Sequence, residues 1–134
     1  MRAAIRHWLK FSAVSAAGVA VQAAVLELLL RAMGLHYLAA SALAVEAAVL
    51  HNFFWHRIWT WPDRPGETVS LLLRFHLTNG ALSVVGTVFL MRVLVGGGVL
   101  APALANLASI AFCSLLSLLS FFVSDRLVFT ARRV

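Results

Sequence analysis

The sequence predicts an all-α integral membrane protein with four transmembrane helices. Of its 134 residues, 62% are hydrophobic and only 12% are charged, and the apolar residues fall into four long runs. A soluble domain carries about 25% charged residues, so a soluble fold of this length could not bury so much apolar surface. We therefore expect a single transmembrane domain over residues 1–134, with lipid as its solvent.

Each apolar run is close to the length that a helix needs to cross a bilayer. A span takes about 20 residues, and lipid offers backbone polar groups no partner, so each run should be helical. Gly34 and the triplet Gly96–Gly98 predict tight turns between spans. The predicted spans are residues 11–30, 37–54, 77–95 and 100–123, with a polar cytoplasmic loop over about 58–74.

The basic residues concentrate on one side of the predicted bundle. Nine of the eleven lysines and arginines precede the first span, lie between the second and third, or follow the fourth; only Arg31 and Arg92 fall on the other side. The positive-inside rule then places both termini in the cytoplasm of a multi-pass protein. This placement accounts for the net charge of +6 without a nucleic-acid partner. Membrane lipids with anionic head groups are the expected electrostatic partners.

The chain contains an internal repeat. Lys10-Phe11 opens the first span and Arg74-Phe75 opens the third, while "NFFWHRIWTW" (52–61) closes the second and "SFFVSDRLVF" (120–129) closes the fourth. Two helix pairs with the same orientation form two parallel two-helix repeats, related by an axis along the membrane normal. The paired motifs would then lie together on the cytoplasmic side.

These motifs, together with "HNFFWHRIWTW" (51–61), "RFHLTNG" (74–80) and "SDRLVF" (124–129), resemble the GtrA-like family of four-helix bacterial membrane proteins. The resemblance covers residues 10–130. It implies translocation of a polyprenyl-phosphate-linked sugar across the bacterial cytoplasmic membrane, for synthesis or modification of cell-surface polysaccharides. The family often has Asn-Phe at the end of the fourth helix, where this chain has Ser120-Phe121.

Such a substrate suggests a set of candidate binding residues. Its phosphate would sit at the interface, where arginine and lysine make strong charge-assisted hydrogen bonds; the candidates there are Lys10, Arg57, Arg74 and Arg126. Its sugar needs amide, hydroxyl or carboxylate groups, which Gln22, Glu46, Asn52 and Asn79 can supply. The fourth span carries a stripe of small polar residues at steps of three or four: Ser109, Cys113, Ser117, Ser120 and Ser124. This stripe and the paired motifs add the candidates His51, His56, Ser120, Ser124 and Asp125.

Two glutamates lie within predicted spans. A charge at the position of Glu46 costs about 2.5–3.5 kcal/mol on insertion scales, which favours a functional carboxyl. The alternative for Glu46 is a protonated or internally paired carboxyl that fixes helix packing. Glu27 precedes Arg31 by one helical turn, and this spacing predicts a local ion pair.

The sequence contains no pattern typical of an enzyme. No phosphate-binding loop or catalytic constellation is evident, and His51 and His56 have no third ligand, so we expect no catalytic residues, metal or cofactor. Two alternatives to a translocase remain: a small proton-coupled efflux transporter, against which the one-sided charge argues, and a non-transporting scaffold for a membrane glycosyltransferase. We also expect a homodimer, packed through small-residue faces that contain Ser12, Ser15, Gly18, Asn79, Ser83 and Gly86.

Overall fold

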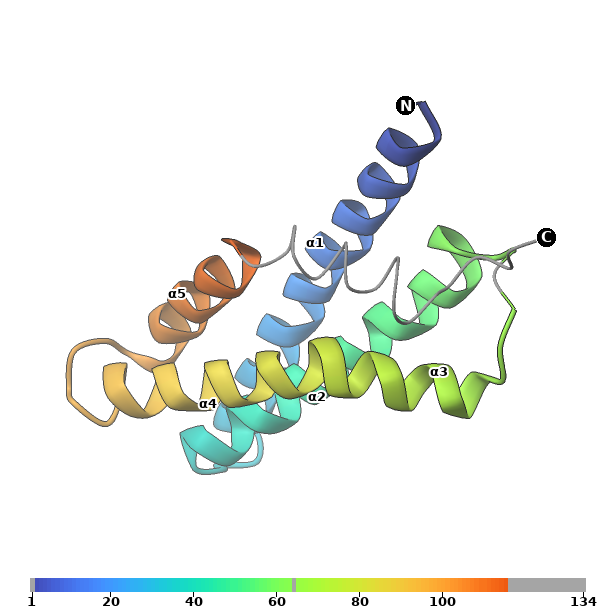
Figure 1. Cartoon of the computed structure of the whole chain (residues 1–134). Coiled ribbons are helices and arrows are strands. Elements are labelled where there is room, and N and C mark those ends of the chain that lie inside the picture. The colour runs from blue at the N-terminus through green and yellow to red at the C-terminus, as the bar shows by residue number, and fades with distance from the viewer. Residues whose placement is uncertain (1, 64, 116–134) are drawn as a thin grey trace.

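A computed structural model describes residues 2–63 and 65–115, and all regular structure in this part of the chain is helical. Two of the helical segments, η1 and η2, are π-helical and continue their neighbouring α-helices without a break, so the elements join into four rods (Figure 1). The elements are α1 (Arg2–Arg31), α2 (Tyr37–Trp55), η1 (His56–Thr60), α3 (Thr68–Phe75), η2 (His76–Gly80), α4 (Ala81–Leu94) and α5 (Pro102–Leu115).

Three of these rods are long and apolar enough to cross a membrane: Ile5–Arg31, Tyr37–Thr60 and Thr68–Leu94. Between 22% and 39% of their most apolar stretches is buried, so most of this surface points outward. Large side chains such as Leu77 and Phe89 are 75% and 64% exposed. Apolar surface on this scale marks contact with lipid or protein rather than water. The predicted all-α integral membrane fold is therefore confirmed, and α5 adds a shorter apolar helix.

The connection between the second and third rods is shorter than predicted. Helix continues through Thr60 and resumes at Thr68, so the connection comprises residues 61–67 rather than 58–74. Arg74, at the end of the predicted loop, is helical, because arginine is a good helix former and extends its charged end to the interface. The third rod consequently begins nine residues earlier than the predicted span, at Thr68 instead of Leu77.

The predicted glycine turns are confirmed. Gly34 has φ +61° between α1 and α2, and Gly98 has φ +71° between α4 and α5. Only glycine adopts this left-handed conformation without a steric penalty. The described part of the fourth predicted span, α5, follows the second turn, and residues 116–123 of that span lie outside the described residues.

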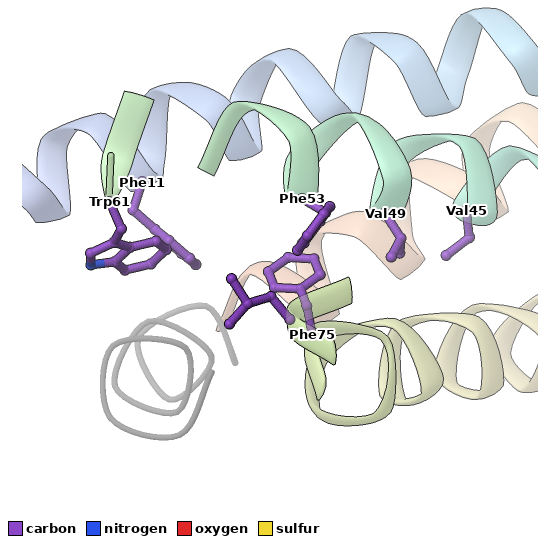
Figure 2. Close-up of a cluster of buried hydrophobic side chains, with 7 residues drawn as sticks. Phe11, Val45, Val49, Phe53, Trp61 and Phe75 are labelled. Atoms are coloured by element: carbon purple, nitrogen blue, oxygen red, sulfur yellow. The ribbon is translucent and has the colours of Figure 1, made fainter. Parts of the chain in front are cut away.

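An aromatic cluster joins three rods at one end of the bundle (Figure 2). Phe53 of α2 lies against Phe75 of α3, with ring centroids 5.7 Å apart, and Phe11 of α1 lies 6.0 Å from Trp61. The first and third rods therefore begin where the second ends. This is the arrangement that the predicted repeat requires, since it brings both basic-Phe motifs to the same end.

Glu27 and Arg31 form the predicted ion pair near the end of α1. A second apolar cluster lies nearby, where Leu26 packs with Ala40 and Ala44 of α2. The small alanine side chains let α1 and α2 approach closely, as is typical of helices packed in membranes.

Candidate functional site

A cavity of about 130 Å³ lies between α1, α2, the η2–α4 rod and α5. Polar side chains gather around it although the rods that enclose it are apolar. Those that line it are Ser15, Gln22, Asn52, His56, Asn79, Ser83 and Thr87. Polar side chains inside a membrane are costly, and they are usually retained for binding or transport. The cavity is therefore the candidate functional site.

The two predicted repeats contribute equivalent residues to this cavity. Steps of four residues from the two basic-Phe motifs lead along the cavity wall, through Phe11, Ser15 and Val19 on α1 and through Phe75, Asn79 and Ser83 on the third rod. Residues four apart share one face of a helix. The first helix of each repeat therefore faces the cavity with residues at matching positions.

Asn52 packs directly against the backbone of α1 at Gly18. A Cβ atom at position 18 would lie 2.8 Å from Asn52 Nδ2 and closer still to Oδ1, nearer than real Cβ contacts. Asn52 Oδ1 also lies 3.2 Å from His51 Nδ1, within hydrogen-bond distance. Glycine at position 18 therefore makes room for the Asn52 amide in the cavity wall.

A buried amide pair connects α1 to α5 beside the cavity. Gln22 Nε2 donates a hydrogen bond to Asn106 Oδ1 at 2.8 Å. Gln22 is 8% exposed and Asn106 is 2% exposed. Because both amides are buried and each would otherwise lack a partner, the bond links the first and fourth rods.

His56 forms the aromatic end of the cavity. Its ring stacks on Phe11, with centroids 4.6 Å apart and planes 6° from parallel, and it also contacts Trp61 and Phe75 at 5.3 and 5.8 Å. Its Nδ1 lies 3.0 Å from Thr60 Oγ1. His56 begins η1, and Asn79 lies in η2. Single π-helical turns are frequent at functional sites, and here both occur beside the cavity.

The described basic candidates lie at the end of the bundle near the aromatic cluster and do not line the cavity. Lys10 Nζ donates to the Trp59 carbonyl oxygen at 3.0 Å, and Arg57 Nη2 donates to the Gly66 carbonyl oxygen at 3.5 Å. Arg74 is exposed on α3, next to Phe75 of the aromatic cluster. Lys10, Arg57 and Arg74 therefore form a charged rim at this end of the bundle and are not placed to contact a head group inside the cavity.

Glu46 lies outside the cavity, contrary to its prediction as a head-group contact. Its Oε2 lies 3.2 Å from Nε2 of His76, which links α2 to η2. Glu46 and Asn52 are six residues apart, and at 3.6 residues per turn this spacing puts them on different faces of α2. The paired-carboxyl alternative is the one that the structure favours. No sequence pattern predicted His76 as the partner of Glu46.

Sequence reasoning missed several residues in and around the cavity. Ser83 was placed on one face with Asn79 but interpreted as a dimer contact, and Thr87, one four-residue step further on, was not singled out. Asn106 is a single amide in an apolar run, and its pairing with Gln22 had no sequence signature. Ser120, Ser124, Asp125 and Arg126 lie outside the described residues.

Four of the six small residues expected at a dimer contact line the cavity. Ser15, Gly18, Asn79 and Ser83 all line the cavity inside one chain. Ser12 and Gly86 do not line it, and the homodimer stays a prediction.

A sequence model of the GtrA/DPMS transmembrane domain matches residues 10–132, nearly the whole chain. The chain belongs to the GtrA/DPMS transmembrane-domain family. The GtrA-like resemblance of its motifs is thereby confirmed. A dolichol-phosphate mannosyltransferase of Pyrococcus furiosus is similar to this GtrA/DPMS chain, with 42% identity over 69 residues. That match covers 51% of the chain and 19% of the archaeal protein, so the two share one segment and not their full lengths.

Proposed function

We propose that this chain binds the head group of a polyprenyl-phosphate-linked monosaccharide in its intramembrane cavity and moves it across the bacterial cytoplasmic membrane. The observation that carries the proposal is the concentration of amide and hydroxyl side chains around one cavity between apolar rods. Amides both donate and accept hydrogen bonds, as hydroxyls do, which suits the hydroxyl-rich edge of a sugar.

The rest of the substrate would meet matching chemistry around the cavity. Its apolar tail can remain in lipid. Its phosphate can meet the charged rim of Lys10, Arg57 and Arg74, since arginine and lysine favour phosphate at an interface. The positive-inside rule assigns this rim to the cytoplasm, where lipid-linked sugars would be loaded.

The size of the cavity suggests how transport proceeds. At about 30 Å³ per molecule, 130 Å³ holds roughly four waters, whereas small-molecule pockets usually measure about 300–1,000 Å³. We therefore expect that the helices must separate further to admit a whole sugar. Regular hydrogen bonding already shifts at η1 and η2, and π-helical turns are places where helices bend.

Transport in this proposal is passive, driven by synthesis of the lipid-linked sugar on one side and its use on the other. Glu46 lies near the middle of the second span. It is paired with His76 and does not line the cavity. We expect Glu46→Gln to leave the transport rate within about twofold of the parent protein, because an amide can still hydrogen-bond to His76. Loss of transport in this variant, with normal folding, would indicate proton coupling through Glu46.

The proposal is tested by reconstituting the full chain in liposomes with a panel of polyprenyl-phosphate sugars and measuring movement between leaflets. Asn79→Ala should lower the rate about fivefold, because one hydrogen bond to the head group is worth about 1 kcal/mol. Leu77→Ala is the matched control: it lies two residues away on an exposed surface and should leave the rate unchanged. Equal rates for both variants would contradict a head-group site in the cavity.

The mannosyltransferase relative supports a second candidate function, a membrane scaffold that holds a glycosyltransferase near its lipid substrate. Reconstitution of the chain alone distinguishes the two functions. A translocase moves the lipid-linked sugar without another protein, whereas a scaffold does not move it and instead raises the activity of an added transferase.

A further inference from the structure

A second hollow lies on the outer surface of the bundle, and its chemistry differs from that of the cavity. It runs between α1 and the α2–η1 rod and measures about 440 Å³. Ala13 and Ala17 form a floor of small side chains, and Trp55, Ile58 and Trp59 supply broad apolar walls. We refer to it as the α1–α2 groove. Its three wall residues are 42%, 49% and 43% exposed, so the groove is open along its length.

A positive charge lies at one end of this groove. The ammonium of Lys10 is 5.6 Å from the centroid of the Trp59 ring, and it donates a hydrogen bond to the Trp59 carbonyl oxygen at 3.0 Å. These contacts hold the lysine side chain against Trp59, which lines the groove. An ammonium has three hydrogens to donate, so Lys10 can keep this bond and also bind an anion. The groove thus combines a fixed cation with an apolar channel.

The groove and the cavity lie on opposite sides of the contact between α1 and α2. His51 lines the groove, and its Nδ1 lies 3.2 Å from Oδ1 of Asn52, which lines the cavity. On the facing helix, Ala17 lies in the groove and its neighbour Gly18 borders the cavity. On both helices, therefore, adjacent residues face the two hollows: Ala17 and Gly18 on α1, and His51 and Asn52 on α2.

We propose that the α1–α2 groove holds the first isoprenyl units of the polyprenyl chain, with the phosphate at Lys10 and the head group directed past His51 and Asn52 into the cavity. This inference rests on the proposed function. The phosphate of such a lipid would meet the Lys10 ammonium, and the apolar chain attached to it would lie along the apolar groove. Tryptophan faces also give large apolar contact areas to a branched, unsaturated chain.

Photolabelling of the full chain in phosphatidylcholine nanodiscs tests the groove. The probe is polyprenyl phosphate with a diazirine on the isoprenyl unit next to the phosphate and with no sugar. We expect labels on the groove residues of α1 and α2–η1. Ala17→Phe should reduce labelling about tenfold, equivalent to roughly 1.4 kcal/mol of binding, because the added ring fills the channel. Ala16→Phe places the same ring on an exposed face outside the groove and should leave labelling unchanged.

Two further measurements identify the occupant. Lys10→Gln should weaken labelling by the phosphate probe and not by the matching polyprenol probe. Excess unlabelled polyprenyl phosphate should compete, whereas excess phosphatidylglycerol should not. Undiminished labelling in Ala17→Phe, or equal competition by phosphatidylglycerol, would overturn the groove assignment and indicate an ordinary lipid contact.

The sugar-free probe separates this inference from the proposed function. Loss of groove labelling with normal, Asn79-dependent sugar transport would refute the groove and leave the translocase standing. Groove labelling as expected, with no sugar transport by the reconstituted chain, would uphold the groove and remove the translocase in favour of a prenyl-phosphate-binding scaffold.

Discussion

Replacing Gly18 with alanine is expected to lower the rate of sugar transport about 30-fold while the protein still folds. The new Cβ atom would lie under 3 Å from the Asn52 amide, so that side chain must leave its place in the cavity wall. Two polar contacts are then lost, one to His51 and one to the substrate, at about 1 kcal/mol each. Together they correspond to about 30-fold in rate. Alanine also has the higher helix propensity, by about 1 kcal/mol, so α1 itself should not suffer.

A double-mutant cycle with Asn52→Ala shows whether Gly18 acts through Asn52. Asn52→Ala alone should lower transport by a similar factor, and adding Gly18→Ala should then cause little further loss, because the amide that the methyl group displaces is already gone. Ala16→Val is the matched control on the exposed face of the same helix. If the losses of Gly18→Ala and Asn52→Ala multiply, the glycine serves helix packing and not the placement of the amide.

The sequence predicted the helices and turns well because their signals are local. Apolar run length predicts a span, and a single glycine such as Gly34 or Gly98 predicts a left-handed turn. The Glu27–Arg31 pair was likewise readable, since both residues lie on one helix one turn apart. The ends of the third rod were less predictable. Its first residues, Thr68 to His76, mix charge with apolar residues, and packing of Leu71 and Phe75 in the core extends the helix.

The candidate site was predicted only in part, because a cavity depends on how helices rotate against one another. Gln22, Asn52 and Asn79 were chosen by residue type and His56 from the motif that closes the second span, and all four line the cavity. Glu46 was chosen on the same grounds and lies on another face of α2. Gly18 suggested a dimer contact, since a sequence does not reveal whether a small residue admits another chain or a side chain of its own. The π-helical turns at His56 and His76 had no sequence signal.

The amide pair that joins α1 to α5 should make a measurable contribution to stability. Gln22→Leu or Asn106→Leu alone is expected to lower the free energy of unfolding by about 1–2 kcal/mol. This range reflects the cost of leaving a buried amide unpaired, moderated by the partners that polar groups find in an unfolded membrane chain. Reversible unfolding of the purified protein in mixed detergent micelles measures this change.

The double variant, with leucine at both positions, distinguishes a specific bond from general packing. Each single variant leaves one amide buried without its partner, and the double variant leaves none, so it should be no less stable than either single variant. Ser109→Ala is the control within α5: its hydroxyl donates to the Ala105 carbonyl of its own helix, so its removal should cost under about 0.5 kcal/mol and should not couple to Gln22. Additive losses for Gln22 and Asn106 would mean that their hydrogen bond does not hold the first and fourth rods together. The cavity would then owe its shape to apolar packing alone.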